Sequence, residues 1–175
     1  MYSSVAPLSL AFSQIVLDLS AAHPDILILV GTQTGNSEGV AEVVAEQLGD
    51  IGFTCHVVDM AEAYPEMLAD YQQLVVVMCT WAEGSFPDNT VEFYDALMVV
   101  KPDLSKLSYG MIGLGDHDYD PFYLTANYKL AATLEECGAT SAIDILEIDG
   151  TPKKRHLKGA KEWTLNAVEA FAVGS

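Results

Sequence analysis

Long apolar runs alternate with helical patterns along this chain from residue 25 onward. The two clearest runs are DILILVG at 25–31 and LVVVMCT at 74–80, and others lie at 55–59, 109–115 and 142–148. An apolar run without polar alternation is typical of a parallel strand that is covered on both faces. We therefore predict parallel strands at these five ranges, with 25–31 in the centre of the sheet.

The segments between these runs have the spacing of amphipathic helices. From 38 to 48 the apolar positions 40, 43, 44 and 48 form one side, and Gly49 is expected to end the helix. Further helices are predicted at 60–69, which contains Pro65, and at 90–100, 124–137 and 158–172. Five βα units of this size predict a doubly wound α/β sandwich.

Residues 1–24 precede the first strand, and we treat them as an extension of a domain that covers 25–175. Helical spacing in this extension predicts a short amphipathic helix, packed on the domain or on a partner, from the positions Leu8, Phe12, Ile15 and Leu19. Its apolar part is too short to span a bilayer and contains Asp18. It also lacks the positive n-region and cleavage site of a secretory signal.

Charge is distributed unevenly along the chain. The formal net charge is −17, and residues 1–100 carry fourteen acids and no Lys or Arg. This distribution argues against nucleic acid and anionic membranes as partners, and it favours docking on a basic protein surface. Three cysteines, an odd number without C-x-x-C spacing, predict free thiols in a reducing compartment, so we expect a cytoplasmic location.

Polar loops follow the first, third and fourth predicted strands, where a doubly wound sheet binds its ligands. They are TQTGNS at 32–37, WAEGSFPDN at 81–89 and DHDYDPF at 116–122. The first loop leads into a helix start, whose free N–H groups can hold a phosphate without basic side chains. An ordinary turn with Thr34 or Asn36 as a helix cap is the alternative.

The second and third loops each present a large aromatic residue, Trp81 and Tyr119. A planar ligand between them would stack on both faces, which is worth on the order of 1 kcal/mol per ring. Each aromatic alone is more often a packing residue, but both beside a phosphate-type loop predict a site for an aromatic ring system with a phosphate.

Other chemistry is less well supported by the sequence. Asp116, Asp118 and Asp120 alternate as in a calcium loop, but Pro121 and Asn127 stand where such a loop needs Gly and Glu. We therefore expect no metal site. No nucleophile elbow or catalytic triad order is apparent, and a dinucleotide-binding G-x-G-x-x-G is absent after the first strand, so we assign no catalytic residue.

Three motifs in order resemble the flavodoxin family. They are TQTGNSEGVA (32–41), CTWAEGSFPDNTVEFYDAL (79–97) and GLGDHDYDPF (113–122), and KPDLSKLSYG (101–110) is similar to the MioC type especially. The resemblance covers most of the chain. It extends to short-chain flavodoxins and to the FMN domains of diflavin reductases such as cytochrome P450 reductase and sulfite reductase flavoprotein.

This resemblance implies a three-layer sandwich with a five-stranded parallel sheet in the order 2-1-3-4-5. It also implies FMN, with its phosphate on residues 32–37 and its ring between Trp81 and Tyr119. The implied cofactor-binding residues are Thr32, Gln33, Thr34, Gly35, Asn36, Ser37, Thr80, Trp81, Ala82, Glu83, Gly84, Leu114, Gly115, Asp116, Tyr119 and Phe122. Ala82 departs from the family pattern, which usually has Gly there. No long insertion splits the last predicted strand, which fits the short-chain class.

The resemblance favours an FMN-binding electron carrier, a monomer or weak dimer. Its expected partners are an NADPH-dependent flavin reductase as donor and a redox acceptor protein, docked through the acidic surface. Two alternatives are an FMN-dependent quinone or nitro reductase and a flavin-free interaction module of the same fold.

Overall fold

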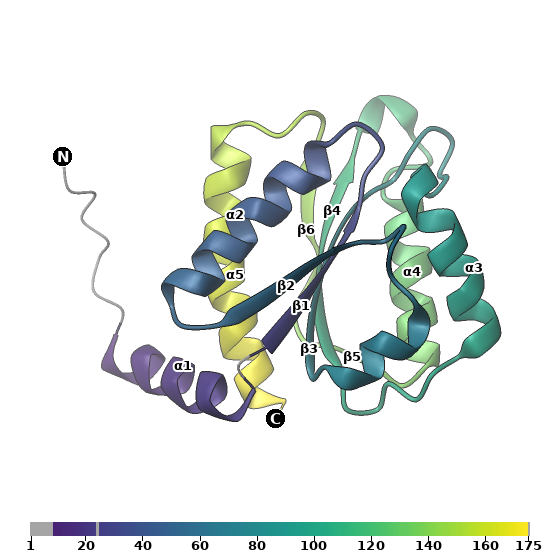
Figure 1. The fold of residues 1–175 in the computed structure, drawn as a ribbon. Helices are drawn as coiled ribbons and strands as arrows, with labels where there is room; N and C mark the ends of the chain where they lie inside the picture. The colour runs from purple at the N-terminus through teal and green to yellow at the C-terminus, as the bar shows by residue number, and fades with distance from the viewer. Residues whose placement is uncertain (1–8, 24, 175) are drawn as a thin grey trace.

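A parallel β-sheet forms the middle layer of the computed structural model, which describes residues 9–23 and 25–174 (Figure 1). The strands are β1 (Asp25–Gly31), β2 (Thr54–Asp59), β3 (Gln73–Cys79), β4 (Ser108–Gly115), β5 (Thr140–Ser141) and β6 (Leu146–Asp149). Their order is β2-β1-β3-β4, and both β5 and β6 pair with β4. Every pairing is parallel, so the predicted 2-1-3-4-5 order is confirmed.

Helices cover both faces of this sheet (Figure 1). The α-helices are α1 (Leu10–Ala22), α2 (Asn36–Asp50), α3 (Val91–Val100), α4 (Thr125–Glu136) and α5 (Lys154–Val173). Three short 3₁₀ turns are η1 (Pro65–Asp70), η2 (Asp88–Thr90) and η3 (His117–Tyr119). Helices α2 and α5 lie on one face, whereas α3 and α4 lie on the other.

The alternation of side chains along β1 explains why its sequence is apolar throughout. Ile26 and Ile28 belong to the core under α2 and α5, whereas Leu27 and Leu29 belong to the core under α3 and α4. All four are buried. Because successive strand residues point to opposite faces, a strand covered on both sides needs apolar residues at every position.

The prediction of one continuous last strand is wrong, because β5 and β6 are separated by residues 142–145. The cause lies on β4, where a Cβ at Gly110 would lie 2.8 Å from the Trp163 ring and 3.1 Å from Ile143. Trp163 Nε1 donates to the carbonyl of Asp144 at 3.1 Å. The indole and Ile143 therefore occupy the space beside Gly110, and the strand leaves the ladder there.

The predicted helix at 60–69 is also wrong in its extent. Residues 60–62 form a turn that does not continue as a helix, and only Pro65–Asp70 is helical, as a 3₁₀ segment that begins at the proline. Proline is well suited to the first position of a helix because it has no N–H to leave unpaired. The other predicted helices and strands are present with ends that differ by a few residues, the largest shift being the start of α5 at Lys154 instead of 158.

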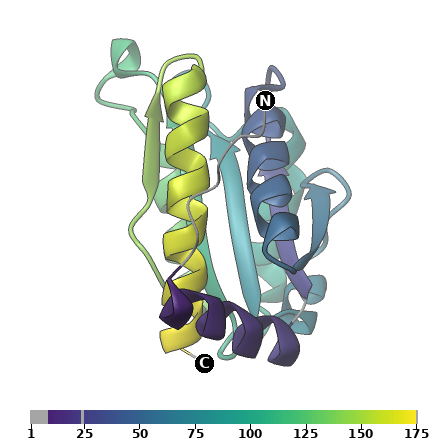
Figure 2. The same cartoon turned by 90° about the vertical axis from the view of Figure 1, so that its left-hand side faces the viewer.

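Helix α1 packs on the domain, at the end of the sheet where α5 ends (Figure 2). Its buried residues Phe12, Val16 and Leu19 share the core under α2 and α5. The predicted Leu8 lies outside the described residues, and Ile15 is partly exposed. Ser9 caps the helix by accepting the Phe12 N–H at 3.1 Å. Within the described ranges no helix has the length and apolarity needed to cross a membrane.

The packing of α1 predicts a strong contrast between two leucines on this helix. Leu19 is 4% exposed and Leu17 is 62% exposed. We expect Leu19→Ala to lower the free energy of unfolding by about 2–5 kcal/mol, the usual cost of truncating a buried leucine. Leu17→Ala is the matched control and should change it little. Urea denaturation measures both variants, and equal midpoints would show that α1 does not pack as described.

Candidate functional site

A cavity of about 280 Å³ lies at the carboxyl ends of β1, β3, β4 and β6. Its wall brings together predicted residues from all three loops: Thr32, Thr34, Asn36, Thr80, Trp81, Ala82, Leu114, Gly115, Asp116 and Tyr119. Phe122 lines a small adjoining cavity with Ala82 and Tyr119. The other predicted residues, which do not line the wall, are Gln33, Gly35, Ser37, Glu83 and Gly84.

Helix α2 begins at this cavity without a side-chain cap. Its N-cap residue is Gly35, with a left-handed φ of 88°, and no side chain accepts from the first turn. Glycine adopts this conformation without the steric cost that a Cβ brings. Thr34 and Asn36 therefore do not cap the helix, and its first N–H groups remain available to an anion.

Ser37 lies in the first turn of α2 and is fully buried. Its Oγ has no hydrogen-bond partner that meets the usual geometric limits among the described residues. Burial raises the pKa of the neighbouring Cys79 thiol, and the Gln33 N–H and the Ser37 hydroxyl partly oppose that shift. An unsatisfied buried hydroxyl costs about 1–3 kcal/mol, so an anionic oxygen bound at the helix start would fit the donor set present.

The loop after β1 is held by the amide of Asn89 in the loop after β3. Asn89 Oδ1 accepts the Thr32 N–H at 3.0 Å. Its Nδ2 donates to the Val30 carbonyl at 3.2 Å and to Asp59 Oδ1 at 3.0 Å. The Asn89 side chain thus joins the ends of β1 and β2 to the loop that follows β3.

Gln33 and Asp88 make a second connection between the same loops. Gln33 Nε2 donates to Asp88 Oδ2 at 3.0 Å, and the Asp88 N–H donates to Gln33 Oε1 at 2.9 Å. Both ends of the Gln33 amide are therefore engaged away from the cavity. Any contribution of Gln33 to a bound phosphate has to come from its backbone.

Thr80 and Trp81 start the second loop from a fixed base. The Thr80 hydroxyl donates to Asn127 Oδ1 at 2.8 Å and accepts the Ala126 N–H at 3.1 Å. Asn127 is buried on α4, and its Nδ2 donates to the Met78 carbonyl at 2.8 Å. The residue before Trp81 is therefore fixed by hydrogen bonds that join the end of β3 to α4.

The turn after Trp81 is tight. Trp81 and Ser85 exchange backbone hydrogen bonds of 2.8 Å in both directions, and the Gly84 N–H donates to the Ala82 carbonyl at 2.9 Å. Ala82 has a φ of 44°, in the left-handed region where a residue with a Cβ typically costs about 1–2 kcal/mol. The departure from Gly at this position is thus accompanied by a strained backbone.

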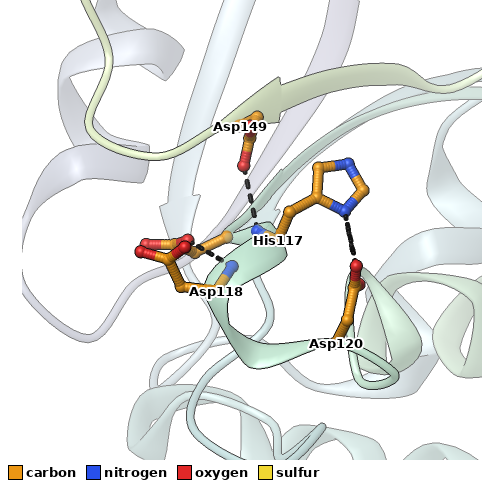
Figure 3. A network of polar contacts seen from close by, with 5 residues as sticks. His117, Asp118, Asp120 and Asp149 are labelled. Carbon is orange, nitrogen blue, oxygen red and sulfur yellow. Dashed lines mark hydrogen bonds and ion pairs between the residues drawn. The ribbon is translucent and has the colours of Figure 1, made fainter.

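Tyr119 belongs to the loop after β4, and Asp149 at the end of β6 holds this loop through a hydrogen bond to His117 (Figure 3). Asp149 Oδ1 accepts the His117 N–H at 3.0 Å, and His117 Nδ1 lies 3.2 Å from Asp120 Oδ1. The His117 ring also stacks on Tyr123, with ring centroids 3.7 Å apart. This arrangement fixes both flanks of Tyr119, whose own side chain remains exposed.

Three wall residues were not among those predicted: Cys79, Gly150 and Thr151. Cys79 is the last residue of β3, and the other two follow β6 directly. The rule that ligands bind beyond the carboxyl ends of the strands also applies to the last strand. Applying it there would have identified Gly150 and Thr151 from the sequence.

Comparisons with known proteins place this geometry in a family. The family model described as Flavodoxin matches residues 28–163. Protein MioC of Escherichia coli K12 is 35% identical over 142 residues, which are 79% of this chain and 92% of that protein.

The sulfite reductase [NADPH] flavoprotein alpha-component of Vibrio parahaemolyticus is 33% identical over 144 residues, or 82% of this chain. The chain spans 22% of the length of that protein and similarly small parts of its counterparts in other bacteria.

Solved structures show the same fold. Oxidised Flavodoxin 1 from Bacillus cereus superimposes with a TM-score of 0.76 at 24% identity, over 83% of this chain and 97% of that one. A short-chain flavodoxin associated with a non-canonical PDU bacterial microcompartment gives 0.74 at 26% identity, with the same coverage. The fold, the order of the loops and the family match agree, and the chain belongs to the flavodoxin family.

Proposed function

We propose that this chain is an FMN-binding electron-transfer protein. One observation supports this most directly: a single cavity joins an uncapped helix start to two exposed aromatic residues on separate loops. FMN has a phosphate that suits the helix start and a planar ring that suits the two aromatic residues. Bound FMN supplies reversible electron transfer, and the chain supplies binding, orientation and the electrostatic environment.

The phosphate is held by backbone N–H groups of the first turn of α2, together with nearby hydroxyl groups. The Thr32 hydroxyl already accepts the Gly35 N–H at 2.9 Å, which leaves its own proton free to donate. Thr34 and Asn36 line the same wall, and the buried Ser37 hydroxyl makes no hydrogen bond of ordinary geometry among the described residues. These donors and the helix dipole replace the basic side chains that this part of the chain lacks.

The ring would lie between Trp81 and Tyr119. Their side chains are 44% and 57% exposed, so a bound ring would remove a large apolar area from water. The tight turn at 81–85 and the hydrogen bonds around His117 hold the two aromatic residues in place before the ring arrives. Preorganised side chains lower the entropic cost of binding.

Electron transfer needs partner proteins on both sides. We propose an NADPH-dependent flavin reductase as the donor and a redox acceptor protein in the same compartment, the cytoplasm. The name of the sulfite reductase relatives refers to an NADPH-linked flavoprotein, and this chain corresponds to about a fifth of it. The acidic residues of the first hundred positions fit a basic docking surface on such partners.

Thr34 tests the assignment of the phosphate loop. Thr34→Leu removes a hydroxyl and crowds the helix start, so FMN should bind more weakly by about 1–3 kcal/mol, the usual value of a hydrogen bond to a charged group. Riboflavin, which has the ring without the phosphate, is the matched ligand and should bind the variant and the wild type alike. Flavin fluorescence titration measures both affinities. An unchanged FMN affinity would refute the assignment.

Asn89 tests whether the clamp between the loops matters for the cofactor. Asn89→Ala leaves the Thr32 N–H without its partner, whereas the Val30 carbonyl keeps the Met60 N–H, so we expect stability to fall by about 1–3 kcal/mol and FMN to bind more weakly. Gln33→Ala breaks only the exposed contact with Asp88 and is the matched control, with a much smaller effect on both quantities. Similar losses in the two variants would contradict a specific role of Asn89.

A further inference from the structure

Most of the positive charge of this chain is concentrated in one short stretch. Five of its eight Lys and Arg residues lie within 153–161, a range that contains no acid. We call this range the basic stretch; its cations are Lys153, Lys154, Arg155, Lys158 and Lys161. The rest of the chain has three basic residues against 25 acids.

The basic stretch lies beside the candidate site. It forms the N-cap and the first two turns of α5, and it begins two residues after Thr151 of the cavity wall. Figures 1 and 2 show the start of α5 at the end of the molecule that carries the loops after β1 and β4, whereas α1 lies at the other end. The side chains of all five cations are exposed.

Three of these cations have no acidic partner among the described residues. Lys158 lies 3.8 Å from Glu162 and Lys161 lies 3.5 Å from Glu46, but no salt bridge involves Lys153, Lys154 or Arg155. The first turn of α5 also contains no acid to neutralise its positive dipole end. The free charge is therefore greatest at the start of the helix.

His156 lies within this stretch and responds to its charge. Burial lowers the pKa of His156, and the positive charges of Arg155 and Lys153 lower it further, whereas the Asp149 carboxylate partly opposes them. Its Nδ1 accepts the Lys153 N–H at 3.1 Å, a bond that requires this nitrogen to be unprotonated. The local potential is thus positive although the whole protein is strongly acidic.

We propose that the basic stretch is a docking surface for an acidic patch on a partner protein, next to the cavity wall. At physiological ionic strength the Debye length is about 8 Å, so most acids elsewhere on the chain are screened from a group that contacts α5. Where the partner is one of the redox proteins considered above, this role rests on the proposed function, but binding itself does not require a flavin.

The shape of the surface favours a protein over other anions. The five cations line no part of the cavity wall, and along the helix Lys154 and Lys161 are about 10 Å apart, so no concave site gathers them around a single phosphate. A nucleic acid or an anionic membrane extends far beyond this distance and would meet the acids of the remaining chain. A patch of a few carboxylates matches the stretch in size and sign.

The surface is tested by charge reversal with a matched control. The test variant combines Lys153→Glu, Lys154→Glu and Arg155→Glu. The control combines Lys101→Glu, Lys106→Glu and Lys129→Glu, which makes the same change in net charge at exposed positions outside the stretch. The probe is a fluorescent poly-glutamate peptide, and its anisotropy is measured with FMN-free and FMN-loaded protein at low and at physiological ionic strength.

We expect the wild type to bind the peptide at physiological ionic strength, where most distant acids are screened, the test variant to bind about tenfold more weakly or not at all, and the control to bind nearly as well as the wild type. Circular dichroism and FMN affinity should be the same for all three proteins. A peptide that does not bind the wild type, or an equal loss in both variants, overturns the proposal. Tighter binding of inorganic phosphate, duplex DNA or phosphatidylserine vesicles than of the peptide also overturns it. Peptide binding by a protein that fails to bind FMN would uphold the docking surface and contradict only the proposed function.

Discussion

The amide of Asn89 holds together the loops on which the rest of the site depends. The ends of parallel strands leave backbone groups without ladder partners, and each such group needs another hydrogen bond. Asn89 satisfies the Thr32 N–H, adds a second donor to the Val30 carbonyl, which also accepts the Met60 N–H, and contacts Asp59, so it sets the end of β1 against β2 and against the loop that carries Trp81. The direction in which α2 begins, and with it the anion site, follows from this arrangement.

A second constraint comes from charge. With no Lys or Arg before Lys101, the first loop has no cation of its own to offer a phosphate, and the proposed site relies on helix N–H groups and hydroxyls instead. Such a site binds an anion without making the surrounding surface basic. The acidic residues before Lys101 therefore have no Lys or Arg between them, and the concentrated positive charge lies on a different element, at the start of α5.

The break in the last strand contributes to the site as well. Trp163 Nε1 donates a hydrogen bond to the Asp144 carbonyl, and Ile143 lies beside Gly110. The chain therefore stops pairing with β4 after β5 and pairs with it again as β6. The end of β6 then brings Asp149 to the His117 N–H, and the Gly150 N–H donates to the Gly115 carbonyl at 2.8 Å. The packing of Trp163 and Ile143 against Gly110 thus helps to place one wall of the cavity and to support the loop that contains Tyr119.

The sequence by itself determined the buried strands, the loops that gather at their carboxyl ends, and the family. These depend on local patterns: apolar runs at 25–31 and 74–80, a glycine before a helix, and aromatic residues in polar loops. Only the tertiary structure decided that the Gln33 side chain turns to Asp88 and that the last strand breaks at 142–145. Thr32 and Asn89 are 57 residues apart, and Asp144 and Trp163 are 19 apart. Periodicity and spacing report on neighbours within an element, whereas these contacts join separate elements, so they become visible only when the chain has folded.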